Sequence, residues 1–496
     1  MNLIKSTGTF SLFTLLSRIL GYLRDFFIAI YLGSGPIADA FFVAFRIPNT
    51  FRRLFSEGTF NAAFIPSYTN ENSKSKNSGK IFSDNVLNLL LIFLLILVFI
   101  IEILMPWFVL LIAPGFKENQ DKLNLAIQLT RITFPFLLFV SLSSFFSAIL
   151  NSHNKFGAAS AAPIILNIFL IFVLLYGKYL DDKLVFYLSY AVTLAGIFQL
   201  IFLYFFVKKH YSPKINFKFK IDNKVRLFFG KLLPSIFSSG VTQINILVGT
   251  IIASFEASAV SYLYYADRIY QINLAIAGIA IGTVILPKLS EYIKKNNLKK
   301  INFIQNKSLE LSLFLSLPAT IALVVSSNEI TSSLFGYGSF NETSVKNAGI
   351  ALFYFAFGLP AFALIKIFSS FLFARHNTKT PFYFSLISVF INITISLSLF
   401  NDYGFIIIPI ATTISSWFNA FVLYFYLINK KYFIFLKDFY LSITKILFSC
   451  TIMGIIFQKL INLFSENLIY SSNTKLFYMI IIILITFTAY LFISII

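Results

Sequence analysis

Arginine and carboxylate side chains interrupt three apolar stretches of the sequence, where charged groups are costly. These residues are Arg18, Arg24 and Asp25 in the first stretch, Asp39, Arg46, Arg52, Arg53 and Glu57 in the second, and Asp267 and Arg268 in the third. An ionisable group at the centre of a membrane-spanning helix costs about 2.5–3.5 kcal/mol, so the set must face water, protein or a ligand. Because a guanidinium binds phosphate oxygens in pairs, we expect an anion-binding site in which the carboxylates orient the arginines.

Helical spacing divides these charges into stripes and outliers. Residues seven apart lie near one line along a helix, which gives two stripes: Ser11, Arg18 and Asp25, and Asp39, Arg46 and Arg53 with Glu57 one turn beyond. Charges within a stripe can neutralise one another. Arg24 and Arg52 lie about 120° from their stripes and are the arginines least obviously paired. One hypothesis assigns Arg18, Arg24, Arg52 and Arg268 to an anionic ligand; the alternative is that all these charges form internal salt bridges that fix helix packing.

The sequence lacks the motifs of several kinds of catalytic and metal-binding sites. No G-x-x-x-x-G-K-[ST] phosphate loop occurs, so ATP hydrolysis by that route is not expected. His153, His210 and His376 lie at expected helix ends without an H-E-x-x-H motif or ligand-like clustering, and Cys450 is the single cysteine. We therefore predict no catalytic residue, no metal site and no disulfide.

Composition indicates which elements must hold the charged residues. The chain has 496 residues, of which 58% are hydrophobic and 12% charged, and its mean hydropathy is +0.82. Apolar stretches recur along it, each long enough to cross about 30 Å of hydrocarbon as a helix. These values are typical of an all-α polytopic membrane protein.

Fourteen membrane-spanning helices are predicted from apolar runs between polar, glycine or proline breaks. They cover 8–33, 37–68, 81–112, 123–150, 158–179, 184–208, 231–255, 258–291, 302–326, 344–374, 380–400, 404–429, 438–460 and 476–496. The longer segments, such as 37–68 and 258–291, must tilt, kink or project beyond the bilayer.

Basic residues are unevenly distributed between the two sets of connections. The set on the N-terminal side contains Lys74, Lys76, Lys80, Lys155, a run from Lys208 to Lys231, a run from Lys288 to Lys300, Arg375, Lys379, Lys430, Lys431 and Lys437. The opposite set contains only Lys117, Lys122, Lys178, Lys183, Lys346, Lys459 and Lys475. By the positive-inside rule the first side is cytoplasmic, and an even number of helices puts both termini there.

The segment from Lys208 to Lys231 is basic with interleaved phenylalanines. Nucleic-acid binding is the weaker interpretation of this pattern. The stronger one is a cytoplasmic amphipathic segment that lies on anionic headgroups and links two halves of the chain. We therefore expect membrane lipids, and no nucleic acid, as partners.

Matching segments recur about 222 residues apart. The pairs are 41–48 with 263–270, 150–154 with 373–377, and 166–168 with 391–393. A common offset indicates duplication, and a repeat of six helices gives both halves the same topology, related by an axis along the membrane normal with a cavity between them. The sequence thus predicts an N-terminal lobe over 1–210, an amphipathic linker over 211–230, a C-terminal lobe over 231–430 and two further helices over 431–496.

At these motifs the chain resembles the MurJ (MviN) family of lipid II flippases, within the multidrug/oligosaccharidyl-lipid/polysaccharide exporter superfamily. The resemblance rests on the segments S-R-I-L-G-Y-L-R-D at 17–25, A-D-A-F-F-V-A-F at 38–45, P-N and R-R-L-F-S-E-G within 48–58, Y-Y-A-D-R at 264–268 and K-T-P at 379–381. It covers roughly residues 1–430.

The resemblance implies a flippase of the bacterial cytoplasmic membrane that moves lipid II, an undecaprenyl-diphosphate-linked muropeptide, to the outer leaflet for peptidoglycan synthesis by alternating access. Arg18, Arg24, Arg52 and Arg268 would bind the diphosphate in the central cavity, supported or gated by Asp25, Asp39, Glu57 and Asp267. The two C-terminal helices would form a groove for the lipid tail. Other cell-wall synthesis proteins are candidate partners.

One departure from the family pattern concerns the coupling ion. Members with a sodium site in the second lobe often carry an aspartate in the seventh helix, where this chain has Gly249-Thr250. The sequence therefore disfavours a sodium site and predicts no cofactor. It leaves coupling to the membrane potential, or to another monovalent cation, as the source of energy.

Four other functions fit the sequence less well. A flippase for another polyprenyl-diphosphate oligosaccharide, of the O-antigen type, would share the anionic headgroup, and a drug exporter would need uncompensated carboxylates instead of arginines. A membrane glycosyltransferase would need a catalytic acid or base, for which Glu329 and Glu342 are the external candidates. A structural scaffold would tolerate the loss of the arginines.

Overall fold

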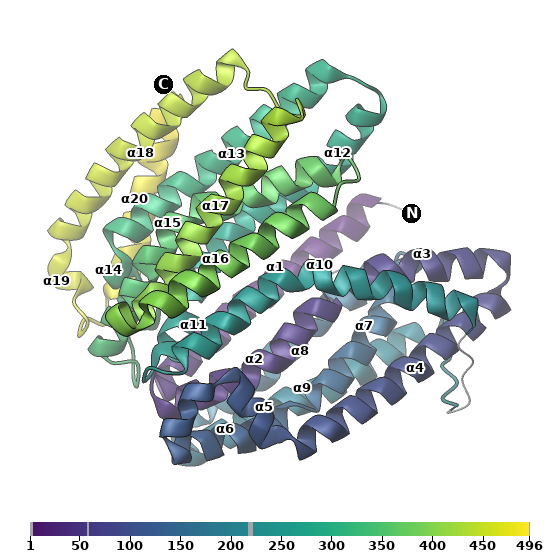
Figure 1. Cartoon of the computed structure of the whole chain (residues 1–496). Coiled ribbons are helices and arrows are strands. Elements are labelled where there is room, and N and C mark those ends of the chain that lie inside the picture. Colours follow the sequence, from purple (N-terminus) through teal and green to yellow (C-terminus); the bar gives the residue numbers. More distant parts are fainter. Residues whose placement is uncertain (1–2, 57–58, 217–221, 496) are drawn as a thin grey trace. The chain divides into compact units, whose positions relative to one another are not determined.

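The computed structural model describes residues 3–56, 59–216 and 222–495, and it contains helices and no strand within those ranges (Figure 1). Two compact units divide the chain, Met1–Ser258 and Ala259–Ile496. The predicted all-α membrane protein is confirmed. The four-part division by lobes, linker and C-terminal helices follows the sequence repeat and stays a prediction.

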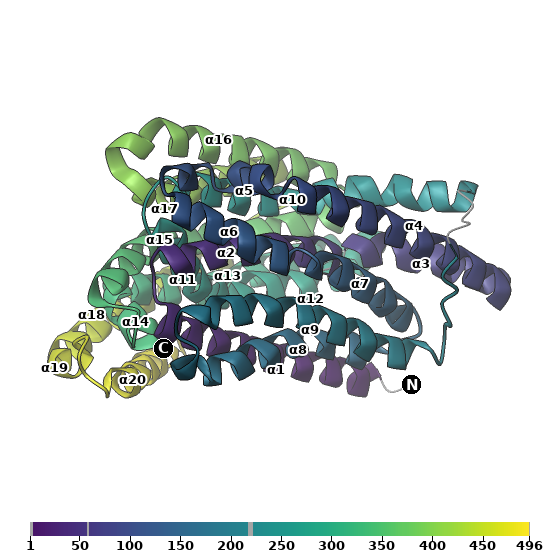
Figure 2. The same ribbon diagram turned by 90° about the horizontal axis from the view of Figure 1, so that it is seen from below.

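The first unit contains ten α-helices and three short 3-10 turns within its described residues. They are α1 (Leu3–Leu32), α2 (Pro36–Ser56), α3 (Thr59–Lys74), α4 (Lys76–Ile103), α5 (Met105–Ile112), η1 (Pro114–Glu118), α6 (Gln120–Thr133), α7 (Phe136–Ser152), α8 (Phe156–Leu175), η2 (Gly177–Tyr179), η3 (Asp181–Lys183), α9 (Leu184–Val207) and α10 (Asn223–Ala253). In Figure 2, α8 lies beside α1 and α9, and it packs against both. The contact of α1 with α8 positions the arginines of α1.

Helix α10 is held in the first unit by aromatic packing. Phe228 is fully buried, and its ring lies 5.7 Å from that of Phe60, 5.9 Å from that of Phe64 and 6.1 Å from that of Phe82, all centre to centre. These partners come from α3 and α4. Edge-to-face pairs of this kind add to the free energy gained by burying apolar area.

The second unit is built around α15 (Glu342–Phe373), which packs against α11 (Ala259–Leu274), α13 (Leu298–Val325) and α17 (Ile407–Asn429). Its other elements are the π-helical turn η4 (Ala275–Ala280), α12 (Ile281–Lys294), α14 (Ser327–Phe335), α16 (Lys379–Tyr403), η5 (Gly404–Ile406), α18 (Lys437–Leu463), α19 (Ser465–Leu468) and α20 (Lys475–Ile495). In Figure 1, α18 and α20 lie side by side, and α18 also packs on α13.

Each predicted membrane segment corresponds to one helix or to two consecutive helices. Within the described ranges, ten helices are long and apolar enough to cross a membrane, so the polytopic class is confirmed and the number fourteen stays a prediction. Helices α1 and α2, two of the three helices that the charged residues interrupt, are not among the ten found in the described ranges. Pro135 explains the break between α6 and α7, because proline cannot donate the backbone hydrogen bond that would continue the helix.

The start of α10 bears on the predicted linker. Helix α10 begins at Asn223 rather than at 231, so the last residues of the predicted linker are helical. Asp222 caps the helix, because its Oδ1 accepts hydrogen bonds from the backbone N–H groups of Lys224 and Val225. An aspartate at this position satisfies backbone donors that the first turn leaves without partners.

The internal repeat has a structural counterpart in two asparagines. Asn88 of α4 donates from Nδ2 to the carbonyl oxygen of Lys214 (2.9 Å) and accepts at Oδ1 from the N–H of Asn216 (2.9 Å). About 220 residues later, Asn306 of α13 donates to the carbonyl oxygen of Ile434 (2.9 Å) and accepts from the N–H of Leu436 (3.1 Å). Each asparagine clamps the chain that leaves the last helix of its own half.

The backbone conformation at another repeated motif shows which residues of the two halves correspond. Helices α7 and α15 both end in a left-handed residue, Asn154 (φ 60°) and His376 (φ 58°). The following N–H groups, of Lys155 and Asn377, return to the carbonyl oxygens of Leu150 and Leu372. This is the same helix-ending motif in both halves. The sequence pairs His153 with His376, whereas the backbone pairs Asn154 with His376.

Candidate functional site

Arg24 forms the best-defined buried polar cluster of the first unit. Its Nε and Nη2 donate to Oδ1 of Asp25 at 2.9 and 2.7 Å, and its Nη1 donates to Oδ1 of Asn167 on α8 at 2.9 Å. Arg24 is 7% exposed and Asp25 is 3% exposed. The guanidinium carbon also lies 5.6 Å from the centre of the Phe45 ring. Arg24 is therefore oriented by partners from α1, α2 and α8.

The expectation that Arg24 has no obvious partner is wrong. Adjacent residues on a helix point about 100° apart and rarely face each other, which is why spacing did not pair Arg24 with Asp25. The long arginine side chain bridges that angle.

Asn167 is a site residue that sequence reasoning missed. Its Nδ2 donates to the backbone carbonyl oxygen of Ser17 at 2.9 Å, which fixes the amide so that Oδ1 faces Arg24. A signal existed in the sequence: Asn167 belongs to the repeated segment 166–168, for which no function had been assigned.

Arg18 lies on α1 before Arg24, with an exposed side chain that forms no ion pair with any residue in the described ranges. Asp25 pairs with Arg24 and not with Arg18, its neighbour in the predicted stripe. Arg18 therefore keeps its positive charge accessible.

Asp39 is fully buried near the start of α2. Its Oδ2 accepts from Nζ of Lys122 on α6 at 2.6 Å and from the backbone N–H of Ser258 at 3.0 Å. The Lys122 ammonium, 7% exposed as a residue, also lies 4.0 Å from the centre of the Phe116 ring. The predicted stripe assigned Asp39 to arginines of its own helix, and this ion pair to another element was not foreseen.

The segment after α10 is held at a second point. Ser254 Oγ accepts from the N–H of Gly115 in η1 at 3.0 Å. A Cβ on Gly115 would lie 2.3 Å from the carbonyl oxygen of Ser254, so only glycine fits this contact. Asp39 and Gly115 together fix residues 254–258, the chain that leads out of the first unit.

Asp267 and Arg268 lie on α11 in the second unit, both partly buried. Asp267 Oδ2 accepts from Nε2 of Gln271 one turn later, and the Arg268 guanidinium lies 4.6 Å from the centre of the Tyr264 ring. Stacking on an aromatic face holds a guanidinium without using its N–H donors.

Two predicted site residues, Arg52 and Glu57, and the neighbouring Arg53 escape this description. Arg52 and Arg53 lie in the last turn of α2, with side chains outside the described residues, and Glu57 lies wholly outside them. Among the predicted residues that are described, the structure joins Arg24 with Asp25 and places Asp39 in a separate contact.

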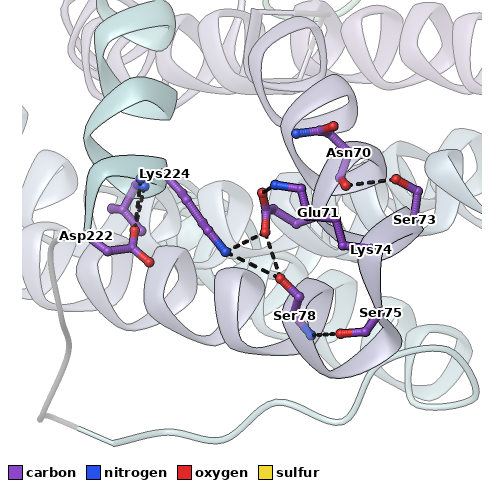
Figure 3. A network of polar contacts seen from close by, with 9 residues as sticks. Asn70, Glu71, Ser73, Lys74, Ser75, Ser78, Asp222 and Lys224 are labelled. Atoms are coloured by element: carbon purple, nitrogen blue, oxygen red, sulfur yellow. Dashed lines mark hydrogen bonds and ion pairs between the residues drawn. The ribbon is translucent and has the colours of Figure 1, made fainter.

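A second polar network, also missed by the sequence, joins α3, α4 and α10 (Figure 3). The Glu71 carboxylate accepts from Nζ of Lys74 and Nζ of Lys224, each at 2.6 Å, and from Ser78 Oγ at 2.7 Å. Glu71 lies beyond the predicted membrane segment 37–68. Its hydrogen bond from Lys224 and then those from Lys74 and Ser78 lower the pKa of Glu71 from 4.5 to about 2.

Two histidines that lie far apart in sequence meet at the end of α7. The rings of His153 and His210 stack with centres 4.7 Å apart, and Nε2 of His153 lies 3.0 Å from the hydroxyl of Tyr68. Burial, and then the charge of His210, lower the pKa of His153. The sequence did not predict this stacked pair. Within the described part of the chain, no group of three metal-ligating side chains forms.

Comparison with known protein families gives one match over most of the chain. The family model described as "Lipid II flippase MurJ" matches residues 28–479. The chain is 37% identical over 472 residues to the probable lipid II flippase MurJ of Rickettsia prowazekii (strain Madrid E), covering 94% of this chain and 92% of that protein. It is 41% identical over 430 residues to the probable lipid II flippase MurJ of Rhizobium meliloti (strain 1021), covering 86% and 80%.

Solved structures give a consistent result. A structure described as lipid II flippase MurJ in an inward closed conformation superposes with a TM-score of 0.82 at 26% identity, covering 98% of this chain and 97% of that one. An inward-facing multidrug resistance MATE family transporter superposes with a TM-score of 0.67 at 18% identity, covering 82% and 93%. The second likeness concerns the fold alone.

Proposed function

Because the chain belongs to the lipid II flippase MurJ family, we propose that it moves lipid II from the inner to the outer leaflet of a bacterial cytoplasmic membrane, as a transporter and not as an enzyme. The observation that carries this proposal is the family match over 28–479. Both termini lie in the cytoplasm under this proposal, as the distribution of basic residues predicts.

The diphosphate of lipid II is the part of the substrate that the arginines recognise. A guanidinium has five N–H donors, and Arg24 uses three of them on Asp25 and Asn167. Two donors remain for phosphate oxygens, and the two partners fix the plane in which those donors point. Arg18, Arg52 and Arg268 supply further positive charge in this proposal, with Asp267 supporting Arg268.

Asp39 acts as a gate in this proposal. Its bonds to Lys122 and to the N–H of Ser258 fix the chain that joins the two units. Exchange between inward-open and outward-open states changes that connection, so breaking or forming the Asp39 contacts biases the two states. Glu57 has the same supporting role on α2, and α18 and α20 provide a groove for the lipid tail.

Complementation tests the proposal. Cells depleted of their own lipid II flippase receive this chain, Arg24→Ala, Arg268→Ala or Lys299→Ala, at equal membrane expression. We expect the wild type and Lys299→Ala, an exposed control, to restore lipid II export. Export by each arginine variant is lower by a factor of about ten or more, because each substitution removes charged hydrogen bonds to the diphosphate. Failure of the wild type would reject the proposal. Full rescue by both arginine variants would reject the diphosphate site alone, and export of an O-antigen type lipid instead would move the function to that related substrate.

A further inference from the structure

Lys475, the first residue of α20, is a buried lysine that the proposed substrate site does not use. It is 1% exposed. Its Nζ donates to the carbonyl oxygens of Gly336 and Tyr470 at 2.5 and 2.6 Å, and it lies 4.3 Å from the centre of the Tyr337 ring and 4.6 Å from that of the Tyr470 ring. We call these two carbonyl groups and two rings the cation cage. They are the partners of the ammonium among the described residues, and none of them is a carboxylate.

The cation cage holds the chain in place because a buried charge tolerates little displacement. Removing an ammonium from water is costly, and here no counter-charge offsets that cost. Carbonyl oxygens and aromatic faces offset it only at short distance. The groups of the cage must therefore stay around Lys475, which fixes the start of α20 against the loop at 336–341 between α14 and α15.

Further contacts hold the same two segments together. Ser333 of α14 donates its hydroxyl to the backbone carbonyl oxygen of Lys475 at 3.4 Å, and Tyr470 donates its hydroxyl to the carbonyl oxygen of Phe340 at 3.1 Å. In Figure 1, α14 lies beside α19 and α20, and it packs against both. The chain before α20 is thus fastened to α14 and to the loop that follows it.

The loop at 336–341 also holds α11. Phe335, just before the loop, and Phe340, within it, are fully buried, and their ring centres lie 5.1 and 4.7 Å from that of Tyr265. The Tyr265 ring meets the Tyr264 ring edge to face with centres 5.6 Å apart, and the Arg268 guanidinium stacks on Tyr264. Buried side chains pack at high density, so a displacement of the loop is passed on to α11.

We propose that Lys475 is a positioning residue for Arg268. Its ammonium fixes the loop at 336–341, the loop fixes Tyr265, and Tyr265 fixes the ring on which Arg268 stacks. This inference rests on the proposed function, in which Arg268 binds the diphosphate of lipid II and α20 helps to form the groove for the lipid tail. The cation cage then links these two parts of the substrate site through packed side chains within one compact unit.

Hydrogen–deuterium exchange of the purified full-length protein, without substrate, tests the positioning. The variants are Lys475→Ala and Lys475→Met, and the control is Lys346→Ala, an exposed lysine near the start of α15. We expect both Lys475 variants to exchange about tenfold faster over 336–341 and over the first two turns of α11, with α17 unchanged, because the loop is released locally. The control exchanges as the wild type does. Lys475→Met keeps most of the volume of the side chain, so the same result in both variants assigns the effect to the charge.

A small ammonium ion distinguishes the cation cage from a contact that only fills space. Methylammonium has three N–H donors, as the lysine ammonium has, so we expect it to restore slow exchange in Lys475→Ala. Tetramethylammonium has no N–H donor, and exchange stays fast in its presence. Failure of methylammonium to restore protection, or unchanged exchange of α11 in both Lys475 variants, would overturn the proposal.

Lipid II binding to the same proteins shows whether the effect reaches Arg268. We expect Lys475→Ala to weaken binding about threefold when Arg268 is present and not at all in the Arg268→Ala background, because a positioning residue acts only through the residue that it positions. Equal weakening in both backgrounds would contradict this. A wild-type protein that does not bind lipid II would reject the proposed function, whereas the exchange experiment would still decide whether Lys475 positions α11.

Discussion

At the scale of single residues, Arg24 combines two properties that a buried anion site needs. Its partners Asp25 and Asn167 offset the cost of burying a charge, and they use three of the five N–H donors, which leaves two for an anion. Asn167 is neutral, so it orients the guanidinium without cancelling its charge. A carboxylate at position 167 would orient the guanidinium and would also add a negative charge beside it.

This difference predicts the behaviour of two variants at residue 167. Asn167→Ala removes one hydrogen bond to a charged group and weakens lipid II binding about tenfold, since such bonds contribute about 1.5–3 kcal/mol. Asn167→Asp keeps the bond but adds a second carboxylate beside Arg24, whose charge Asp25 already balances, so the excess negative charge weakens binding further. Binding of lipid II to the purified variants measures both effects, with Asn392→Ala, the repeat counterpart on α16, as the control. Tighter binding by Asn167→Asp would contradict the assigned role.

The Asp39 ion pair gives a prediction about stability. Asp39→Asn leaves the buried Lys122 ammonium without its counter-charge and lowers the free energy of unfolding by about 3–5 kcal/mol, whereas Asp39→Asn with Lys122→Met removes both charges and recovers most of that loss. The thermal unfolding midpoint in detergent, measured for both single variants and the double variant, gives the coupling. A double variant less stable than both single variants would argue against the pair.

At the scale of elements, α10 is fastened at both ends. Its start is held by Lys224 on Glu71 and its exit by Asp39 and Gly115, while Phe228 packs within the aromatic cluster of α3 and α4. The segment 211–216 is also bound, since Tyr211 donates its hydroxyl to Asp84 at 2.6 Å and Asn88 clamps the chain at 214–216. Residues predicted to form a surface linker are therefore partly built into the first unit.

The contact of Glu71 with Lys224 depends on pH in a defined direction. Because the pKa of Glu71 is lowered from 4.5 to about 2, the carboxylate stabilises the docking of α10 fully above pH 4.5 and loses this effect as the pH falls towards about 2. We expect Glu71→Gln at pH 7 to increase amide hydrogen exchange at the start of α10. Glu291→Gln, which breaks an exposed pair with Lys295, leaves α10 unchanged and serves as the control. Equal protection of α10 in Glu71→Gln and the wild type would show that Lys224 does not hold the helix.

At the scale of the whole molecule, two sources of energy for transport can be compared, the membrane potential and a monovalent cation. The position of Gly249-Thr250 lacks the carboxylate of a sodium site, and the proposed diphosphate site is rich in arginine. The membrane potential acts on a moving charge with about 2.3 kcal/mol per 100 mV. We therefore expect flipping in proteoliposomes to fall by more than about tenfold when the potential is removed and to be unchanged when sodium is replaced by choline. Loss of activity on sodium replacement would favour cation coupling instead.

The sequence predicted the all-α membrane fold because apolar helices depend on local composition, and the arginine site stays a prediction. It missed the partners Asn167, Lys122 and Lys224, which lie 143, 83 and 153 residues from Arg24, Asp39 and Glu71. No periodicity within a helix reports such a contact. Lys122 and Lys224 were assigned to connections by their charge, and the fold brings each to a carboxylate on another helix.

The asparagine clamps also bear on how the chain is made. Asn88 and Asn306 each bind backbone that follows the last helix of their own half, so each half contains its own closing contact. During synthesis the first half can be completed once residue 216 has left the ribosome, before α13 exists. The second half is made later, so we expect loss of either clamp to be a defect of biogenesis in one half that the other half does not share.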